Sequence, residues 1–407
     1  MPTERTVRLT NIAEGQVIGG NKYRLERCVG VGGMGRVFSA KHILFEKMVA
    51  IKFMNRELIG SEEAERMFIQ EAKNCAELAE DNNNIVKVAD VTRDASGVYI
   101  VMELLDGCDL DRLIRDQPLP PGRAVTLMTQ MCTGLETAHQ RGIIHRDLKP
   151  ANVFIERPGP GERAKILDFG LSKHISMPSR TETGVLKGTP LYMSPEQYQS
   201  SPLSARTDVW ALGVILYQML TGDVPFMAEN VYQLGRRVVD THPPPPRAIR
   251  SELDPALDSI VMRCLAKDPA QRFATAPELR EALLDASRID EQLAALSRGS
   301  RGSSAAEVLQ GLVALRQKYP GEGRIHQKIL EHHNRWGAYQ LAVEAYEEAR
   351  RAEALSADVL YQAAVAYQGT RNVQAEAKTL ELALRAGLHP KLETPAKNRL
   401  KKLREES

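Results

Sequence analysis

The chain has 407 residues, of which 43% are hydrophobic and 26% are charged, and its formal net charge is +2 at pH 7. A chain of this length exceeds one ordinary hydrophobic core, so we expect two or three domains in a soluble globular protein. The near-neutral charge balance gives no reason to expect nucleic acid as a partner.

The five cysteines are scattered along the chain and include no CxxC pair. This pattern argues against a disulfide framework or a zinc site and predicts a reducing, cytoplasmic location. Residues 1–20 lack the apolar core of a signal peptide, and the longest apolar run, residues 209–220, is too short to span a bilayer. We therefore expect no membrane segment.

A glycine-rich hairpin is predicted near the N-terminus. Residues 23–29 have the pattern of a strand, and Gly30, Gly32 and Gly35 follow at GxGxxG spacing. Dinucleotide-binding folds share this spacing but need a helix next, whereas residues 36–40 continue as strand. Glycines at a hairpin tip let backbone N–H groups approach phosphate oxygens; the alternative is an ordinary glycine-rich turn.

Lys52 ends the apolar strand of residues 49–51, where it is either a solvated strand end or a phosphate-binding lysine. A helix is predicted over residues 62–80, because Ser61 is a suitable N-cap and apolar residues recur at helical spacing. Two further strands are predicted over residues 86–91 and 98–104. Where the second strand leaves its sheet, its free backbone N–H and C=O groups could bind the edge of an adenine ring.

A short polar loop, residues 145–152, follows an amphipathic helix predicted over residues 121–141. The loop carries a carboxylate, a guanidinium, an ammonium and an amide between two apolar, strand-like pieces, which indicates a candidate site rather than a solvated turn. Sixteen residues after Asn152, Asp168 ends another apolar strand. Both side chains offer hard oxygen ligands of the kind that suits Mg²⁺.

The remaining motifs complete a family pattern. Residues 188–196 end a segment rich in Ser and Thr, residues 208–213 begin the most apolar helix, and Arg272 lies in the motif of residues 267–273. In this order and spacing the motifs resemble those of eukaryotic-type protein kinases, and they most resemble the bacterial branch of serine/threonine kinases. The resemblance covers about residues 23–287.

This resemblance implies an α+β fold with two lobes, a β-rich N-lobe and a helical C-lobe, and it implies ATP with Mg²⁺, for which Mn²⁺ could substitute. Asp147 would accept or orient the substrate hydroxyl, and Lys149 would reach the γ-phosphate. Lys52, held by Glu71, would orient the other phosphates. The metal ligands would be Asn152 and Asp168.

The residues expected around the nucleotide lie on the glycine-rich hairpin, on the neighbouring strands and at the hinge between the lobes. They are Val29, Gly30, Val31, Gly32, Gly33, Met34, Gly35, Val37, Ala50, Lys52, Met102, Glu103, Leu105, Asp109 and Phe154. Met102 would be the gatekeeper, and Asp109 would approach the ribose hydroxyls. For the apolar members of the set, ordinary core packing is the alternative.

The resemblance also implies regulation through residues 171–196. Arg146 would receive a phosphate carried by Thr181 or Thr183, so autophosphorylation is expected, with Ser179 and Thr189 as rival acceptors.

Three structural contacts are implied in the same way. Thr189 would hydrogen-bond beside the catalytic aspartate. Glu196 would form a buried ion pair with Arg272, and His145 would pack against Phe169.

The last hundred residues have a different character. Residues 297–304 read as a flexible linker of Ser, Arg and Gly, and beyond it Ala and Glu dominate. Comparing the tail with itself at an offset of 34 matches Gln340 with Gln374 and Glu347 with Glu381. This period resembles tetratricopeptide repeats, and the alternative is an unrelated stack of helical hairpins. Helices are predicted over residues 324–334, 338–352, 357–368 and 373–386, with capping helices over 305–318 and 391–404.

The sequence thus predicts an N-terminal extension (1–22), a protein kinase domain (23–287), a linker (288–304) and a TPR-like helical domain (305–404). The expected function is transfer of the ATP γ-phosphate to protein Ser or Thr, with a tail that binds a peptide or protein partner. The sequence leaves the oligomeric state open between a monomer and a homodimer. One alternative is a binding module whose kinase domain is only a scaffold. The other, a small-molecule phosphotransferase, is disfavoured by residues 188–196 and by Arg272.

Overall fold

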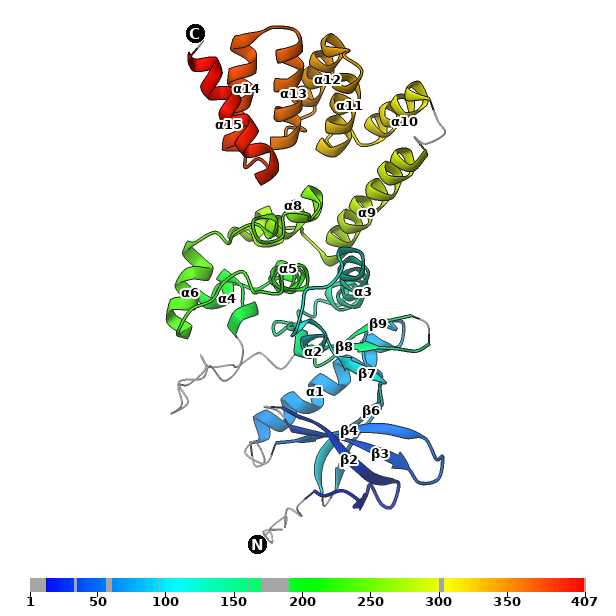
Figure 1. Cartoon of the computed structure of the whole chain (residues 1–407). Helices are drawn as coiled ribbons and strands as arrows, with labels where there is room; N and C mark the ends of the chain where they lie inside the picture. The colour runs from blue at the N-terminus through cyan, green and yellow to red at the C-terminus, as the bar shows by residue number, and fades with distance from the viewer. Residues whose placement is uncertain are drawn as a thin grey trace. The chain divides into compact units, whose positions relative to one another are not determined.

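The computed structural model describes residues 12–32, 35–55, 61–94, 96–159, 161–169, 190–299 and 304–405. The chain separates into two compact units, which join in the sequence between Asp285 and Ala286. The first unit contains all the strands and has two lobes, and the second unit is helical in its described part (Figure 1).

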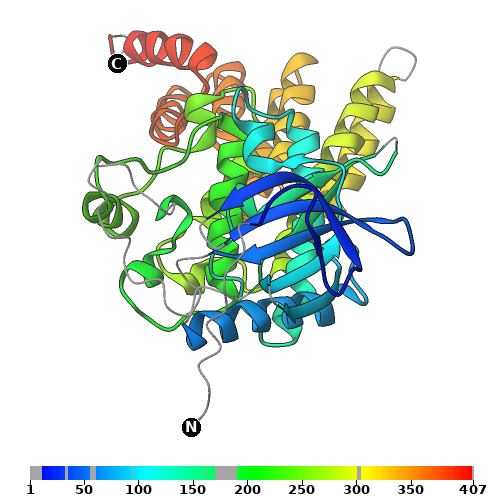
Figure 2. The same ribbon diagram turned by 90° about the horizontal axis from the view of Figure 1, so that it is seen from below.

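The N-lobe is built on a six-stranded antiparallel sheet in the order β1-β2-β3-β4-β6-β5. Its strands are β1 (Val17–Ile18), β2 (Tyr23–Gly32), β3 (Gly35–His42), β4 (Met48–Met54), β5 (Val88–Asp94) and β6 (Gly97–Glu103). Figure 2 shows the blue strands of this sheet side by side. In the register, Val37 pairs with Lys52, and Ala50 pairs with Met102. The pairing therefore brings predicted nucleotide-binding residues from three strands together.

Helix α1 (Glu62–Ala79) begins where the sequence predicts, because the Ser61 hydroxyl accepts a hydrogen bond from the Ala64 N–H at 3.2 Å. The helix buries Phe68 and Ala72 in a cluster with residues of the sheet. Glu71 lies on the same buried face of α1. Packing of the amphipathic helix thus places a carboxylate against the sheet.

Two strands of this sheet differ from the prediction. The sequence analysis did not identify β1, whose two residues pair with Tyr23 and Arg24. Strand β5 begins at Val88 rather than at residue 86, because Val86 instead donates its N–H to the Ile166 carbonyl at 3.1 Å. Both differences depend on pairing with distant residues, which local sequence patterns do not report.

The C-lobe begins with a small sheet in the order β7-β8-β9, formed by β7 (Gly107–Asp109), β8 (Val153–Glu156) and β9 (Arg163–Ile166). Its helices are α2 (Leu110–Ile114), α3 (Pro121–Gln140), α4 (Pro195–Tyr198), α5 (Ala205–Thr221), α6 (Val231–Asp240), α7 (Pro246–Ile249), α8 (Pro255–Cys264) and the first part of α9 (Ala276–Gly299). The two-lobed α+β fold expected from the sequence is therefore confirmed.

Helix α5 is the central helix of the C-lobe, as its apolar sequence predicts. Nearly all of its residues from Thr207 to Thr221 are buried, and it packs against α3 and α8 (Figure 1). A capping box between Ser204 and Thr207 starts the helix, and Gly222, at φ +87°, ends it. A helix that is buried on all sides is a rigid base for the loops that contact it.

Gly107 fixes the chain where it leaves the hinge. Its φ is +148°, and a Cβ atom there would lie 2.0 Å from the Ile155 carbonyl oxygen. That oxygen belongs to the backbone of β8 and cannot easily move away. We therefore expect Gly107→Ala to lower the free energy of unfolding by about 1–3 kcal/mol. Urea unfolding measures the change.

The matched control is Gly122→Ala in the first turn of α3, where an added Cβ would meet no atom within 4 Å. We expect this variant to be neutral or to gain up to about 1 kcal/mol. Equal stability of the two variants would contradict the steric argument for Gly107.

The second unit consists of successive helices that are joined by short turns. They are α10 (Ala305–Lys318), α11 (Gly323–Arg335), α12 (Tyr339–Arg351), α13 (Ala357–Gly369), α14 (Val373–Arg385) and α15 (Pro390–Glu405). Helix α13 begins 34 residues after α11, and α14 begins 34 residues after α12. The predicted helices are confirmed; their membership of the tetratricopeptide family stays a prediction.

The predicted linker, residues 288–304, is helical in its first part, because α9 continues to Gly299. Ile289 is buried in the core of the second unit, and Leu293 and Leu296 pack against that core. Earlier in the same helix, Leu279 and Leu283 are buried. Burial at helical spacing keeps α9 helical through a stretch that composition alone marks as a linker. Among the described residues, no helix is both long and apolar enough to cross a membrane.

Candidate active site

Three charged side chains, from β4, from α1 and from the residues after β9, meet at one point. The Lys52 ammonium on β4 lies 2.9 Å from Glu71 Oε1 on α1 and 2.7 Å from Asp168 Oδ1 after β9. The side chains of Lys52 and Glu71 are only 8% and 2% exposed. The sequence resemblance paired Lys52 with Glu71, and the structure brings them together.

Burial and charge act on these groups in opposite directions. Burial alone would raise the pKa of Asp168, but the Lys52 ammonium and the hydrogen bonds at the carboxylate lower it to about 2. Burial would lower the pKa of Lys52, but Asp168 and Glu71 raise it above its usual value. Burial and the nearby Asp168 raise the pKa of Glu71. Lys52 and Asp168 are therefore both ionised at neutral pH.

The polar loop of residues 145–152 holds Asp147, Lys149 and Asn152 close together. Lys149 Nζ lies 2.7 Å from Asp147 Oδ2. The Asn152 amide donates to the Asp147 carbonyl at 2.8 Å, from the 3-10 turn Pro150–Asn152. The side chains of Asp147 and Lys149 remain partly exposed, at 34% and 22%. They are therefore accessible to a substrate while their backbone is fixed.

Asp208, in the first turn of α5, holds the backbone of this loop. Its carboxylate accepts hydrogen bonds from the His145 N–H at 2.9 Å and from the Arg146 N–H at 3.0 Å. It also contacts His139 Nε2 at 2.8 Å. Arg146 has φ +66°, an unfavourable backbone conformation for a non-glycine residue, which these bonds stabilise.

The sequence analysis did not assign Asp208 and His139 to the site. An aspartate in the first turn of a helix is ordinary, because it complements the helix dipole. Its burial at 1% exposure distinguishes it, and burial follows from the tertiary fold. In the sequence, the feature that could have identified Asp208 is its position at the start of the most apolar helix.

Asn152 and Asp168 have the chemistry expected of a magnesium site. The Asn152 amide nitrogen is engaged with Asp147, so its oxygen is the atom left to bind a ligand. The Leu167 N–H donates to the Asn152 carbonyl at 2.9 Å, which holds the two segments side by side. Asp168 has φ +57°, the second positive φ at this site. One carboxylate and one amide oxygen fit Mg²⁺ that also binds phosphates.

His145 takes the structural position expected for it. Its ring centroid lies 5.0 Å from that of Phe169, and its Nε2 lies 3.0 Å from the Leu167 carbonyl oxygen. Both rings are fully buried. They fix the backbone on both sides of Asp168.

The predicted nucleotide-binding residues occupy neighbouring strands, but their side chains differ in exposure. Val31 is 78% exposed and Val29 is 45% exposed, so these two are not core residues, whereas Ala50 is buried. Phe154 pairs with Asp109 across β8 and β7. Gly33 and Met34 lie outside the described residues.

Asp109 and Glu103, two polar members of the predicted nucleotide-binding set, also have structural partners. Asp109 Oδ1 accepts from the Arg112 N–H at 2.7 Å and caps α2. Glu103 Oε1 accepts from Lys165 Nζ at 2.7 Å and from the Lys87 N–H at 2.8 Å. Lys165 is almost fully buried, so it depends on this carboxylate for its charge partner. The sequence analysis did not identify Lys165.

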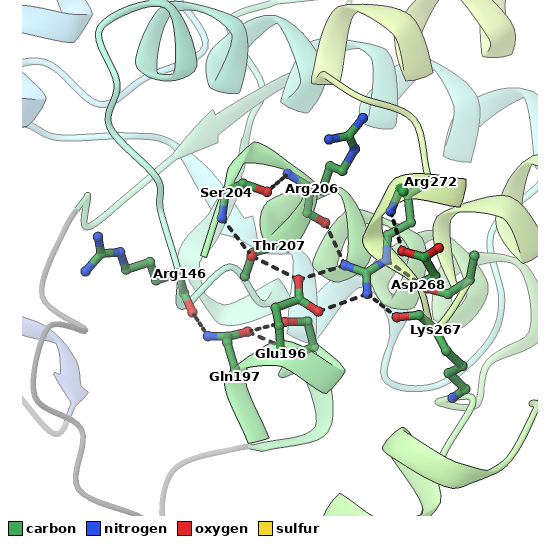
Figure 3. A network of polar contacts seen from close by, with 12 residues as sticks. Arg146, Glu196, Gln197, Ser204, Arg206, Thr207, Lys267, Asp268 and Arg272 are labelled. Atoms are coloured by element: carbon green, nitrogen blue, oxygen red, sulfur yellow. Dashed lines mark hydrogen bonds and ion pairs between the residues drawn. The ribbon is translucent and has the colours of Figure 1, made fainter. Parts of the chain in front are cut away.

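Glu196 and Arg272 form the buried ion pair that the sequence predicts. Arg272 donates through Nη1 and Nη2 to the two oxygens of Glu196, at 2.8 and 2.9 Å (Figure 3). The Thr207 hydroxyl donates to Glu196 at 3.0 Å. The neighbouring Gln197 amide donates to the Arg146 carbonyl at 2.8 Å, which connects this network to the polar loop of residues 145–152 (Figure 3).

Several residues of the predicted regulatory segment lie outside the described residues. They are Thr181, Thr183, Ser179 and Thr189.

Residues 23–283 match the protein kinase domain family, and this match covers more than half of the chain. The chain therefore belongs to the protein kinase family.

Several relatives of the chain within this family come from bacteria. The chain is 36% identical over 293 residues to serine/threonine-protein kinase pkn3 of Myxococcus xanthus, covering 70% of this chain and 53% of that protein. It is 35% identical over 271 residues to serine/threonine-protein kinase PknB of Mycolicibacterium smegmatis, covering 65% and 43%. The chain thus spans about half or less of the length of these relatives.

Among solved structures, the kinase domain of Mycobacterium tuberculosis PknI aligns with a TM-score of 0.54 and 27% identity. The alignment covers 68% of this chain and 99% of that domain.

Proposed function

We propose that this protein is a serine/threonine protein kinase that transfers the γ-phosphate of Mg-ATP to protein hydroxyls. The observation that carries the proposal is the bonding of Lys52 to both Glu71 and Asp168, together with a partly exposed Asp147 that is paired with Lys149. Phosphoryl transfer requires positioning and charge stabilisation more than covalent chemistry, and these groups provide both. The names of the curated relatives support Ser and Thr as acceptors.

Each group has a part in this mechanism. Bound Mg-ATP supplies the phosphoryl group, and the cation offsets its negative charge. Asn152 and Asp168 would hold the metal, and Lys52 would orient the phosphates. Asp147 accepts a hydrogen bond from the substrate hydroxyl, and Lys149, at 2.7 Å from it, places a positive charge where the phosphate moves.

The test is incorporation of phosphate from labelled ATP into a protein substrate by the full chain, with phosphoamino-acid analysis. We expect label on Ser or Thr, and we expect Asp168→Asn to abolish it. Nucleotide binding without transfer would favour the scaffold alternative. Labelling of a small molecule and not of protein would favour the alternative of a small-molecule phosphotransferase.

Autophosphorylation of Thr181 or Thr183 is part of the proposal. Arg146 supports it: its Nε is buried and has no hydrogen-bond partner among the residues that the structure describes. A phosphothreonine carries a charge of about −2 and would pair with this guanidinium.

We expect the double variant Thr181→Ala/Thr183→Ala to show activity lower by a factor on the order of 10 after incubation with ATP. Mass spectrometry of the wild type should place phosphate on one of these threonines, and Ser179→Ala is the matched control. Wild-type activity of the double variant, after full dephosphorylation and renewed incubation with ATP, would refute this part.

We also propose that the helical tail has a TPR-like arrangement. It would recruit a peptide or protein partner, and this partner can be the protein substrate itself. The 34-residue offset between α11 and α13 and between α12 and α14 supports the repeat. A truncation after Gly299 preserves α9 and is therefore the correct comparison. Recruitment predicts a loss in kcat/KM for a protein substrate and no change for a short peptide.

A homodimer through the N-lobe is a further proposal. Leu44 and Phe45, at the turn between β3 and β4, support it, since they are 82% and 72% exposed. Sedimentation of the wild type and of Phe45→Glu tests it. We propose a cytoplasmic location from the free cysteines, which the described structure leaves unbridged.

A further inference from the structure

A short segment before the kinase domain runs along the open edge of β2. The Gly15 N–H donates to the Leu25 carbonyl at 2.8 Å, and the Leu25 N–H donates to the Gln16 carbonyl at 2.9 Å. β1 continues this pairing, with Val17 opposite Arg24. The segment therefore covers part of an edge that would otherwise expose its hydrogen-bonding groups.

Strand β2 has two irregularities in its pairing with β3. Leu25 and Arg27 pair with consecutive residues of β3, as do Cys28 and Gly30, so Glu26 and Val29 are each an extra residue. The second irregularity immediately precedes the glycines predicted to cover the phosphates. A bulge bends its strand and leaves a residue unpaired, so its geometry sets the direction in which the loop continues.

Each irregularity has a side chain that bonds to its backbone. Ser39 Oγ lies 3.4 Å from both the N–H and the carbonyl of Arg27 at the first. At the second, Glu14 Oε1 accepts from the Cys28 N–H at 3.1 Å. Glu14 comes from the segment before the kinase domain, 14 residues earlier in the chain.

The turn that presents Glu14 is itself held in place. The Ala13 N–H donates to Gln16 Oε1 at 3.2 Å, and the Gln16 N–H donates to the Ala13 carbonyl at 3.3 Å. Gly15, at φ +81°, supplies the left-handed conformation of the turn. Because the backbone is already ordered, the Glu14 side chain loses less entropy when it bonds than it would on a free terminus.

We propose that Glu14 is a positioning residue for the glycine-rich end of β2: it fixes the bulge from which Gly30 and Gly32 continue toward the nucleotide phosphates. This inference rests on the proposed nucleotide-binding function of these glycines. Glu14 touches no nucleotide in this role. It lowers the KM for Mg-ATP by holding this end of β2 in one direction, and it leaves the chemical step to the residues of the active site.

The test compares Glu14→Ala and Glu14→Gln in the full chain. Alanine removes the acceptor, and we expect a KM for Mg-ATP about 2- to 5-fold higher with kcat unchanged. Glutamine retains an acceptor oxygen and should behave as the wild type. The matched control is Glu26→Ala, an exposed residue of β2 whose side chain makes no hydrogen bond among the described residues.

Amide hydrogen exchange at Cys28 provides the second measurement, and it does not depend on activity. We expect exchange to be about 2- to 5-fold faster in Glu14→Ala than in the wild type, and unchanged in Glu26→Ala. Faster exchange with an unchanged KM would overturn the positioning role, and unchanged exchange would overturn the contact itself. If the wild type transferred no phosphate, the exchange result would stand and the proposed function would fail separately.

Discussion

Replacement of Asp147 by Asn is expected to lower kcat for phosphate transfer by a factor on the order of 10³. The substitution keeps the size of the side chain and removes its charge. Lys149 Nζ, at 2.7 Å, would lose its carboxylate partner, and the substrate hydroxyl would lose its acceptor. The KM for ATP should stay within a few-fold, since Lys52 and Asp168 are unchanged. Steady-state phosphorylation of a peptide measures both constants.

The control for Asp147→Asn is Asp81→Asn, at an exposed position after α1. It makes the same chemical change away from the site and should leave kcat unchanged. Thermal unfolding of both variants excludes loss of structure as the cause. A kcat for Asp147→Asn within fivefold of the wild type would contradict the assignment of Asp147.

Removal of Arg272 is expected to have the largest effect on stability. Its side chain is fully buried and donates two hydrogen bonds to Glu196 and others to the carbonyls of Ala266, Arg206 and Lys267. Arg272→Ala leaves a buried carboxylate without its cation, so the free energy of unfolding should fall by about 3–5 kcal/mol. Urea unfolding followed by tryptophan fluorescence measures the loss, since Trp210 lies beside Arg272.

The matched control is Arg236→Ala, which breaks the exposed pair with Asp240 on α6. An exposed pair of this kind contributes about 0–1 kcal/mol. If Arg272→Ala lost no more stability than Arg236→Ala, the buried pair would not be a principal support of the C-lobe.

The dependence of folding stability on pH provides a second test of the Glu196–Arg272 pair. Burial raises the pKa of Glu196, but Arg272 outweighs it, so the pKa lies below its usual value in the folded wild type. The pair therefore stabilises the wild type above about pH 4.5, and this contribution is lost as the pH falls through the folded pKa. In Arg272→Ala the Thr207 hydroxyl still donates to Glu196, but the cation that outweighs burial is gone, so Glu196 should bind a proton more readily in the folded state. That variant should regain stability on mild acidification, where the wild type begins to lose it.

The sequence predicted the local elements well. Ser61 marks the start of α1 because N-capping is a local interaction. The tail helices follow from the Ala- and Glu-rich composition and from the 34-residue offset within the tail. The pairing of Lys52 with Glu71 came from family resemblance, since the two residues lie on different elements and no local pattern connects them.

What the sequence did not predict depends on tertiary burial. Asp208 looks like an ordinary helix-start residue until the structure places it against the backbone of residues 145–146. Lys165 looks like a solvated strand residue, but it is buried against Glu103. β1 is only two residues long, so its pairing with β2 leaves no periodic signal. Each depends on a partner more than a few residues away.

Helix α9 has a consequence for how the protein denatures. This one helix contains both Leu283, which is buried in the first unit, and Ile289, which is buried in the core of the second. Because helix formation is cooperative along the chain, melting of one core frays the helix that the other core needs. The two units should therefore not melt as independent bodies: calorimetry of the full chain should give transitions that shift together when either core is weakened.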